Sequence, residues 1–381
     1  MENKFIKFNS PPVISSSVQY IEEVIATGKL SGDGAFTKKC SKWLEEKFKC
    51  KKALLTTSCS MALDMAAILC DIKSGDEVIL PSFTFSSTAN SFVLRGANLI
   101  FIDIDPATMT MDTGLLERAI TDKTKAIVPV HYAGISCDMD AIMSIARKYN
   151  ILVVEDAAQG VMSTYRGVAL GTIGDMGCYS FHETKNFSMG EGGALLVNNE
   201  KLIKRAEIIR EKGTNRAQYL RGEVDKYTWV DLGDSFLPSD LNAAYLWGQL
   251  EMAEDIVKRR LYIWERYKDA FQKYEEENRI KLPRIPGECK HNAHLFYIKL
   301  NDIEERTEYI KYMKESGVAC SFHYVPLHSA PAGKKYGKFF GKDNYTTVES
   351  ERLVRLPLYY NLEDDEVEYI ISCTIKFLES D

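Results

Sequence analysis

The 381-residue sequence lacks a long hydrophobic run, and no apolar stretch approaches the roughly 20 residues that a helix needs to cross a bilayer. Its first residues, MENKFIKFNSPP, contain no apolar segment of the kind that directs secretion. A block of consecutive basic residues is also missing, and the formal net charge is −6. These absences predict a protein that binds neither a membrane nor nucleic acid.

The sequence also lacks the cysteine spacings of disulfide frameworks and zinc sites. Its nine cysteines are odd in number and never form a CxxC pair, which is typical of a reduced, cytoplasmic protein. His291 and His294 stand three residues apart, but no HExxH motif or cysteine cluster accompanies them. We therefore expect these histidines to form hydrogen bonds, and we predict no metal site.

Short β-branched runs alternate with longer segments whose apolar residues recur at helical spacing. This alternation predicts an α/β fold with a mainly parallel, mixed sheet sandwiched by helices. The chain length and its 45% hydrophobic content suit two domains, which we predict at 1–250 and 251–381, the second being a smaller α+β unit. A single long helix over 241–274 is expected to link them. Strands are expected at 77–80, 98–105, 125–132, 151–156, 177–181 and 193–199, and helices at 60–72, 84–96, 113–120 and 139–149.

The stretch from Ile151 to Gly193 brings three reactive groups into one region. Its opening strand, ILVVED, delivers Asp156 to the carboxyl edge of the sheet, where open α/β sheets bind ligands. Ser180 and Lys185 follow in SFHETK. Pyridoxal phosphate (PLP) needs a lysine amine for its aldehyde, an acid for its ring nitrogen and donors for its phosphate. A lone lysine is more often a surface cation and a lone aspartate a turn residue, so it is the combination that predicts PLP.

VEDAAQ followed by SFHETKN resembles the DegT/DnrJ/EryC1/StrS family of sugar aminotransferases, and the likeness extends from FNSPPV to RLPLYYNL. The resemblance implies a fold-type-I PLP-dependent transferase, a homodimer, with Lys185 as the catalytic lysine. It also implies L-glutamate as amino donor and a nucleotide-linked keto sugar as acceptor. The likeness is strongest to members that aminate C4 of TDP-4-keto-6-deoxy-D-glucose to TDP-4-amino-4,6-dideoxy-D-galactose, for lipopolysaccharide or enterobacterial common antigen synthesis.

Further cofactor contacts are expected where a strand passes into a helix at TTSCSMAL. The first N–H groups of such a helix face an anion, so Ser58, Cys59 and Ser60 are candidates for the phosphate, although the local sequence alone favours a plain serine N-cap. The family usually has Ser-Gly-Thr here, from which Cys59 and Ser60 depart. The resemblance also implies that Phe85 stacks on the cofactor ring and that Gln159 lies near its 3-hydroxyl.

The long irregular segment 211–240 is typical of a functional loop, and in the family it reaches across the dimer interface. Ser235 stands where many members carry a phosphate-binding asparagine. For His323, Tyr324 and His328, substrate binding and structural hydrogen bonding stay equally open. The full set of substrate contacts that the resemblance implies is His182, Arg216, Tyr227, His323, Tyr324 and His328.

Other functions fit the sequence less well. A nicotinamide oxidoreductase would show GxGxxG after a strand, and a dehydratase of the same family would carry histidine where Lys185 stands. Relatives that make the equatorial 4-amine or a 3-amino sugar remain alternatives. A non-enzymatic regulatory protein is a remote one, because the acidic composition does not suit DNA.

Overall fold

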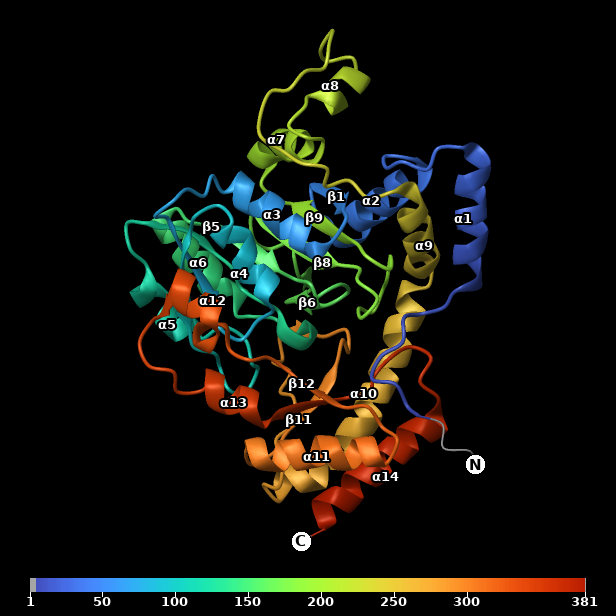
Figure 1. Ribbon diagram of the computed structural model, residues 1–381, viewed down its shortest axis with the longest axis vertical. Coiled ribbons are helices and arrows are strands. Elements are labelled where there is room, and N and C mark those ends of the chain that lie inside the picture. Colours follow the sequence, from blue (N-terminus) through green and yellow to red (C-terminus); the bar gives the residue numbers. More distant parts are fainter. Residues whose placement is uncertain (1–4, 381) are drawn as a thin grey trace.

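The computed structural model describes residues 5–380, and its centre is an eight-stranded mixed sheet (Figure 1). Five of its strand pairs are parallel, and only β9 runs antiparallel to its neighbours β1 and β8. The predicted fold class is confirmed. In sheet order, the strands are β1 (Lys52–Thr56), β9 (Gly193–Val197), β8 (Met176–Ser180), β5 (Leu152–Asp156), β4 (Thr124–Ile127), β2 (Glu77–Pro81), β3 (Asn98–Ile102) and β13 (Gly337–Phe339).

Helices cover both faces of this sheet, because its buried strands are apolar on both sides. Neighbouring residues of β5 show this, since Val153 belongs to one hydrophobic core and Val154 to the core on the opposite face. The helices of this part are α1 (Ser15–Thr27), α2 (Ala35–Phe48), α3 (Cys59–Leu69), α4 (Ser86–Val93), α5 (Thr113–Ala119), α6 (Met139–Tyr149), α7 (Glu200–Arg210), α8 (Arg216–Leu220) and α9 (Asp240–Glu251), with a 3-10 turn η1 (Tyr132–Gly134).

The single long helix predicted for 241–274 is wrong, because the chain breaks between α9 and α10 (Ala253–Glu276). Met252 stands at the break with φ −100° and ψ 14°. The two helices pack against different partners, α9 against α1 and α2, and α10 against α14 (Asp364–Glu379). The two parts of the predicted helix therefore belong to different packing units, and the helix is interrupted where one unit gives way to the other.

Helix α10 and the chain after it build a third hydrophobic core around a small sheet of order β11-β14-β12. It also contributes to the first part of the chain, because β13 adds a strand beside β3 and β10 pairs with β6. The division at residue 250 stays a prediction. The remaining elements are β6 (Thr164–Tyr165), β7 (Val168–Ala169), β10 (Cys289–Lys290), β11 (Phe296–Lys299), β12 (Ser321–Phe322), β14 (Leu353–Leu356), α11 (Ile303–Glu315), η2 (Leu327–Ser329), α12 (Pro331–Tyr336) and α13 (Thr346–Arg352).

Much of the segment 211–240 stands out from the body of the molecule, with α8 near its far end (Figure 1). Apart from α8 it is irregular, as predicted, and it is tied by the bridges Thr214–Trp229 and Glu211–Ser235. Between residues 5 and 380, no helix combines the length and the apolar character that crossing a membrane requires.

Candidate active site

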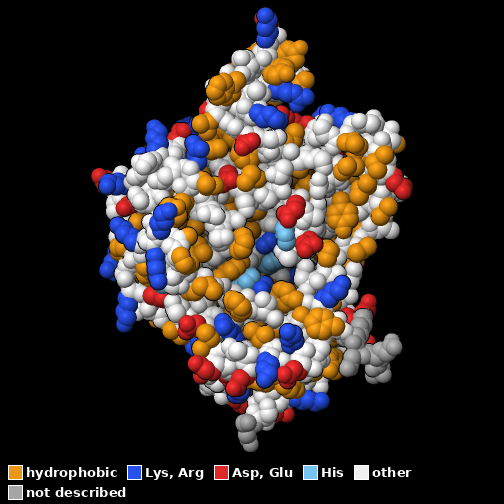
Figure 2. Space-filling view, viewed as in Figure 1, with side chains coloured by type: hydrophobic (Ala, Val, Ile, Leu, Met, Phe, Trp, Pro, Cys, Tyr) orange, Lys and Arg blue, Asp and Glu red, His pale blue; other side chains and the backbone are white. Residues whose placement is uncertain are grey.

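A cavity of about 640 Å³ lies at the carboxyl edge of the parallel strands. One wall comes from the main sheet and α3, and the other from the small sheet, through Phe322 and Arg355, and from Tyr324 in the chain that follows β12. The hollow, with histidine, lysine and arginine side chains inside it, opens on the face shown in Figure 2. Among the predicted residues, those that line it are Ser58, Cys59, Ser60, Phe85, Asp156, Gln159, Ser180, His182, Lys185, His323 and Tyr324.

Four predicted residues lie outside the cavity of their own chain. Arg216 pairs with Glu211 at 3.4 Å, and Tyr227 packs on Tyr219, both within the projecting segment. Ser235 belongs to the same segment. His328 instead bonds Ser82 Oγ through Nδ1 at 2.7 Å and pairs with Asp343 through Nε2 at 3.2 Å. Of the two roles considered for His328, its contacts are those of structural hydrogen bonding and not of substrate binding.

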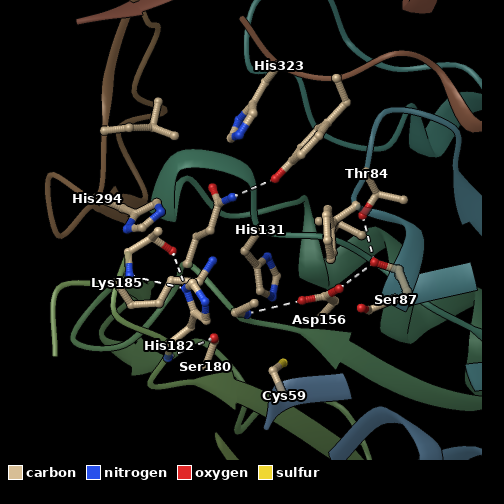
Figure 3. Close-up of a pocket in the computed structure, with 18 of the residues that line it drawn as sticks. Cys59, Thr84, Ser87, His131, Asp156, Ser180, His182, Lys185, His294 and His323 are labelled. Carbon is tan, nitrogen blue, oxygen red and sulfur yellow. Dashed lines mark hydrogen bonds between the residues drawn. The ribbon is translucent and has the colours of Figure 1, made fainter. Parts of the chain in front are cut away.

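Strand β5 separates two adjacent carboxylates, because neighbouring residues of a strand point to opposite faces. Asp156 faces the cavity, where Oδ2 accepts a bond from Thr88 Oγ1 at 2.6 Å and Oδ1 one from the Ala158 N–H at 3.1 Å (Figure 3). Glu155 is fully buried on the other side and accepts backbone bonds from Gly171 and Ile173. Only Asp156 is available to a ligand.

His131 completes the anchoring of Glu155. Its Nε2 lies 2.9 Å from Glu155 Oε2, and its Nδ1 accepts a bond from the Cys137 N–H at 3.2 Å. Because Nδ1 is an acceptor, the proton is on Nε2 and His131 donates to the carboxylate. The pair fixes β5, and hence Asp156, in place.

Lys185 lies in the connection between β8 and β9, and its side chain lines the cavity (Figure 3). Burial lowers the pKa of its amine, and the positive charge of Arg355 lowers it further, while Cys59 and Asp156 act in the opposite direction. The unprotonated amine is the form that reacts with an aldehyde. The local environment therefore suits Lys185 to covalent chemistry.

The amino end of α3, at Ser58, Cys59 and Ser60, forms a candidate anion-binding site beside Lys185, here called the anion cradle. Ser58 is the N-cap of α3 and accepts a hydrogen bond from the Met61 N–H at 3.1 Å, so it does have the N-cap role considered for it. The backbone N–H groups of Cys59 and Ser60 belong to the first turn, whose dipole favours an anion. Burial raises the pKa of the Cys59 thiol, so it stays protonated. Ser180 also lines the cavity.

Aromatic and amide side chains cover the other side. Gln159 Oε1 accepts a bond from the Ala133 N–H at 2.6 Å, and its Nε2 donates to the Tyr324 hydroxyl at 3.1 Å. The ring of Phe85 is 6.4 Å from that of Tyr324, and 60% of Phe85 is exposed. An exposed aromatic at a cavity wall leaves a face free for a planar ligand.

The sequence analysis assigned no role to three residues that line the cavity. Thr88 is 68 residues from Asp156, and nothing local in the sequence signals that contact. Ser87 bonds Ser60 Oγ at 2.7 Å across α3 and α4. Arg355 lies within RLPLYYNL, which carried the family resemblance but no stated role for the arginine.

These residues fit PLP. A lysine with a lowered pKa, a carboxylate held by two donors and a helix terminus for a phosphate share one cavity, whose size suits a cofactor and a substrate. A metal centre has no comparable support, since the described residues contain no group of three or more His, Cys, Asp or Glu placed to hold an ion. The fold and the site thus define a PLP-dependent enzyme of the aminotransferase class.

The chain belongs to the DegT/DnrJ/EryC1/StrS aminotransferase family, whose profile matches residues 13–374. It is 34% identical to the spore coat polysaccharide biosynthesis protein SpsC of Bacillus subtilis, over 97% of this chain and 96% of SpsC. Its structure is similar to the aminotransferase TlmJ of Streptoalloteichus hindustanus, with a TM-score of 0.90, 28% identity and 98% of both chains covered.

It is equally similar to Spr1654 of Streptococcus pneumoniae, a proposed sugar aminotransferase solved in PLP and PMP forms, at TM-score 0.90 and 28% identity over 98% of this chain and 99% of that one. The family membership, the PLP cofactor and the general activity predicted from the sequence are confirmed. The protein is a PLP-dependent sugar aminotransferase that takes an amino donor and a keto sugar.

Proposed function

We propose that this enzyme moves the amino group of L-glutamate to C4 of TDP-4-keto-6-deoxy-D-glucose and releases TDP-4-amino-4,6-dideoxy-D-galactose. The observation that carries the proposal is Lys185, with its lowered pKa, in one cavity with Asp156 and the start of α3. The choice of sugar is supported by KGTNR, KYTW and FHYVPLH, which resemble the corresponding segments of enzymes with this substrate.

In this proposal PLP supplies the electron sink for the breaking C–H bond. Asp156 would keep the ring nitrogen protonated, and its bonds from Thr88 and the Ala158 N–H orient the carboxylate for that task. Lys185 would hold the cofactor at rest and then, as a free amine, take the proton from the donor's α-carbon. In the second half of the cycle Lys185 would return a proton to C4 of the sugar.

The phosphate of the cofactor would bind at the start of α3, through the N–H groups of Cys59 and Ser60, with hydroxyls from Ser58 and Ser180. Gln159 would lie at the 3-hydroxyl and Phe85 against the ring face. This division of roles leaves the small-sheet side of the cavity for the substrates.

Neutral hydrogen-bonding groups on that side suit the hydroxyls of a hexose. Burial lowers the pKa of His323 well below its usual value, so the imidazole is uncharged at neutral pH. Its Nδ1 lies 3.2 Å from the Tyr132 hydroxyl, and Tyr324 stacks on its ring at 3.9 Å. His323, Tyr324 and His182 would contact the sugar.

The active unit would be a homodimer in which the segment 211–240 of each chain completes the partner's site. Tyr227, Trp229 and Val230 are at least half exposed in this segment, a degree of apolar exposure that points to a protein interface. Arg216, Tyr227 and Ser235, which lie outside the cavity of their own chain, would then reach the substrate or cofactor of the partner.

The test is incubation of the purified enzyme with L-glutamate and a panel of nucleotide keto sugars, followed by mass spectrometry and NMR. Lys185 can deliver its proton to one face of the sugar carbon only, so one epimer is expected. An axial 4-amine leaves H4 equatorial and gives small couplings to H3 and H5. Large couplings would establish the equatorial epimer, and an amine at C3 would exclude the regiochemistry proposed here.

A further inference from the structure

His294 presents one ring nitrogen to the cavity, on the side where Lys185 stands (Figure 3). It lies just before β11, is 9% exposed, and has its Nδ1 2.9 Å from Oδ1 of Asn186. Because Asn186 directly follows Lys185, this contact joins the stretch that carries Lys185 to the small-sheet part of the molecule. The other ring nitrogen, Nε2, has no hydrogen-bond partner within residues 5–380. The cavity therefore contains a fixed polar atom that folding leaves unpaired.

The hydrogen bonds around Asn186 determine which nitrogen of His294 carries the proton. Asn186 Nδ2 donates to the Asn292 carbonyl at 3.0 Å, and a carbonyl can only accept. The amide is thereby oriented with Oδ1 toward His294, so Nδ1 of His294 is the donor. Its Nε2 then carries a lone pair and can only accept a hydrogen bond.

His182, which also lines the cavity, has the opposite tautomer. Its Nδ1 accepts a bond from the Thr184 N–H at 3.2 Å, so the proton is on Nε2. That nitrogen lies 3.4 Å from Oε1 of Glu191, a carboxylate that requires a donor. His294 thus offers the cavity a lone pair, whereas His182 directs a proton to a carboxylate.

The backbone around the imidazole of His294 is fixed on both sides, which gives Nε2 a defined direction. Asn292 Oδ1 accepts a bond from the His294 N–H at 3.0 Å. Asn292 Nδ2 donates to the carbonyls of Gln159 and Val161, both at 2.8 Å. Arg260 donates to the His294 carbonyl at 2.6 Å. The acceptor is therefore in place before any ligand enters.

The imidazole of His294 stays uncharged at neutral pH. Burial lowers its pKa well below the usual value, and basic groups lower it further, in the order Lys185, Arg260, His323 and Arg355. A carboxylate in the same place would raise the pKa of a neighbouring amine and keep that amine protonated. A neutral acceptor can hold an amine with little of this effect.

The amine of Lys185 is the donor that this acceptor fits. Its Nζ has no hydrogen bond or ion pair within residues 5–380. Lys185 is also first among the charged groups that act on the pKa of His294. A lysine side chain rotates about four bonds, so an amine without a partner is not confined to one place.

We propose that Nε2 of His294 accepts a hydrogen bond from the Lys185 amine whenever that amine is not bonded to the cofactor, and so holds it at the reacting carbon. His294 is then a positioning residue that takes no proton itself. Asn186 acts on Lys185 through the tautomer that it imposes on the imidazole. The inference rests on the role of Lys185 in the proposed function, and it is independent of the identity of the sugar.

Two substitutions separate the two nitrogens of His294. The shorter amide in His294→Asn reaches only the place of Nδ1, so it keeps the bond to Asn186 and loses the acceptor. The longer amide in His294→Gln reaches the place of Nε2 and restores an oxygen there. His291→Asn is the matched control, because His291 belongs to the same stretch, has its ring 4.5 Å from that of Trp264 and does not line the cavity.

The pH dependence of PLP incorporation into cofactor-free enzyme measures the contact without turnover. An ammonium group donates a stronger hydrogen bond than an amine, so losing the acceptor should lower the midpoint in His294→Asn by about 0.5 to 1 pH unit. His294→Gln should restore at least half of that change, and His291→Asn should match wild type. A wild-type midpoint in His294→Asn, or the same change in both His294 variants, would overturn the proposal.

The wild-type enzyme provides a measurement that needs no variant to fold. Nitrogen NMR of cofactor-free enzyme labelled with ¹⁵N-histidine, with the His294 signal assigned by its loss in His294→Gln or His294→Asn, reports which ring nitrogen is protonated. We expect a protonated Nδ1 and an unprotonated Nε2. A proton on Nε2 would leave no acceptor for Lys185 and would refute the inference.

Stopped-flow absorbance of the donor half-reaction distinguishes positioning from substrate binding. With the α-amino acid that the wild type converts, His294→Asn should slow the step that breaks the C–H bond about 10- to 100-fold and leave the Kd of the donor within about threefold. A weaker Kd with an unchanged rate would assign His294 to the substrate instead. Lys185→Ala is the remaining arm. If it still forms the absorbance of bound PLP, the assignment of Lys185 fails; if it loses that absorbance while His294→Asn behaves as wild type, only the His294 contact fails.

Discussion

At the scale of single residues, the site depends on the surroundings of a few side chains. Asp156 and Glu155 are adjacent and chemically alike, yet Asp156 faces the cavity and Glu155 is buried under His131 and the backbone of 171–174. Lys185 differs from a surface lysine because burial lowers the pKa of its amine. Position in the fold, more than residue type, decides which group can act on a ligand.

Replacing Lys185 tests the central assignment. Lys185→Ala should remove the visible absorbance of bound PLP and reduce turnover by about 10²- to 10⁴-fold, the usual contribution of a positioned acid–base group. Spectra and initial rates of purified enzyme measure both effects. Lys201→Ala, which changes an exposed lysine of α7, is the matched control. Full turnover in Lys185→Ala would rule out the mechanism.

The lowered pKa of Lys185 also predicts a pH dependence. Only the unprotonated amine combines with PLP, so incorporation into cofactor-free enzyme should speed up as the pH rises through this pKa and level off above it. The rise should occur below the ordinary lysine value of 10.5. N-α-acetyl-lysine in the same buffers provides the reference. A midpoint equal to that of the reference would mean that burial does not tune Lys185.

At the scale of elements, the anion cradle depends on a close contact between β9 and α3. A Cβ on Gly193 would lie 2.5 Å from the Cys59 nitrogen, so only glycine lets β9 start beside the first turn of α3. Ser87 in α4 also bonds Ser60 in α3. The N–H groups that face the ligand are thus positioned by three elements, and their placement is sensitive to small shifts.

Gly193→Ala should therefore weaken PLP retention. Because the new methyl group must displace the start of α3, we expect the Kd for PLP to rise about tenfold or more, equivalent to at least about 1.4 kcal/mol. Equilibrium dialysis followed by absorbance measures it. Gly287→Ala is the control, since a Cβ there meets nothing within 4 Å. Unchanged PLP affinity in Gly193→Ala would show that the start of α3 does not contribute to binding.

At the scale of the whole molecule, the cavity is built from parts of the chain that lie far apart in sequence. The main sheet supplies Asp156, the connection between its strands β8 and β9 supplies Lys185, and the small sheet supplies Arg355. Arg260 in α10 helps to join them, because it donates to the carbonyls of Ala293 and His294 at the cavity edge. In the projecting segment 211–240, the apolar side chains Tyr227, Trp229 and Val230 stay at least half exposed in the single chain.

Trp229 is the most exposed large apolar side chain of that segment, at 78%. If the segment lies in a homodimer interface, Trp229→Glu should bury a charge there, raise the dimer dissociation constant at least tenfold and reduce activity at low protein concentration. Sedimentation velocity with parallel assays tests this. Val348→Glu, an exposed apolar site on α13, should change neither property. A wild-type monomer with full activity would exclude the dimer.

The sequence by itself determined the fold class and the centre of the site. Alternating apolar strands and amphipathic helices are local signals, and six strands appear within a few residues of their predicted positions. Asp156, Ser180 and Lys185 come from one continuous stretch of 30 residues or so, in which strand ends and turns place the groups in order. Local chemistry of this kind can be read without knowing any distant contact.

Tertiary structure alone decided the remainder, because it depends on contacts between remote segments. The break at Met252 arises where α9 and α10 pack on different partners, against a helical pattern that continues through it. Thr88 reaches Asp156, and Arg355 faces Lys185, only once two sheets close over the cavity. The sequence suggested the same alternatives, substrate binding or structural hydrogen bonding, for His323, Tyr324 and His328. In the folded chain His328 contacts Ser82 and Asp343 instead of lining the cavity.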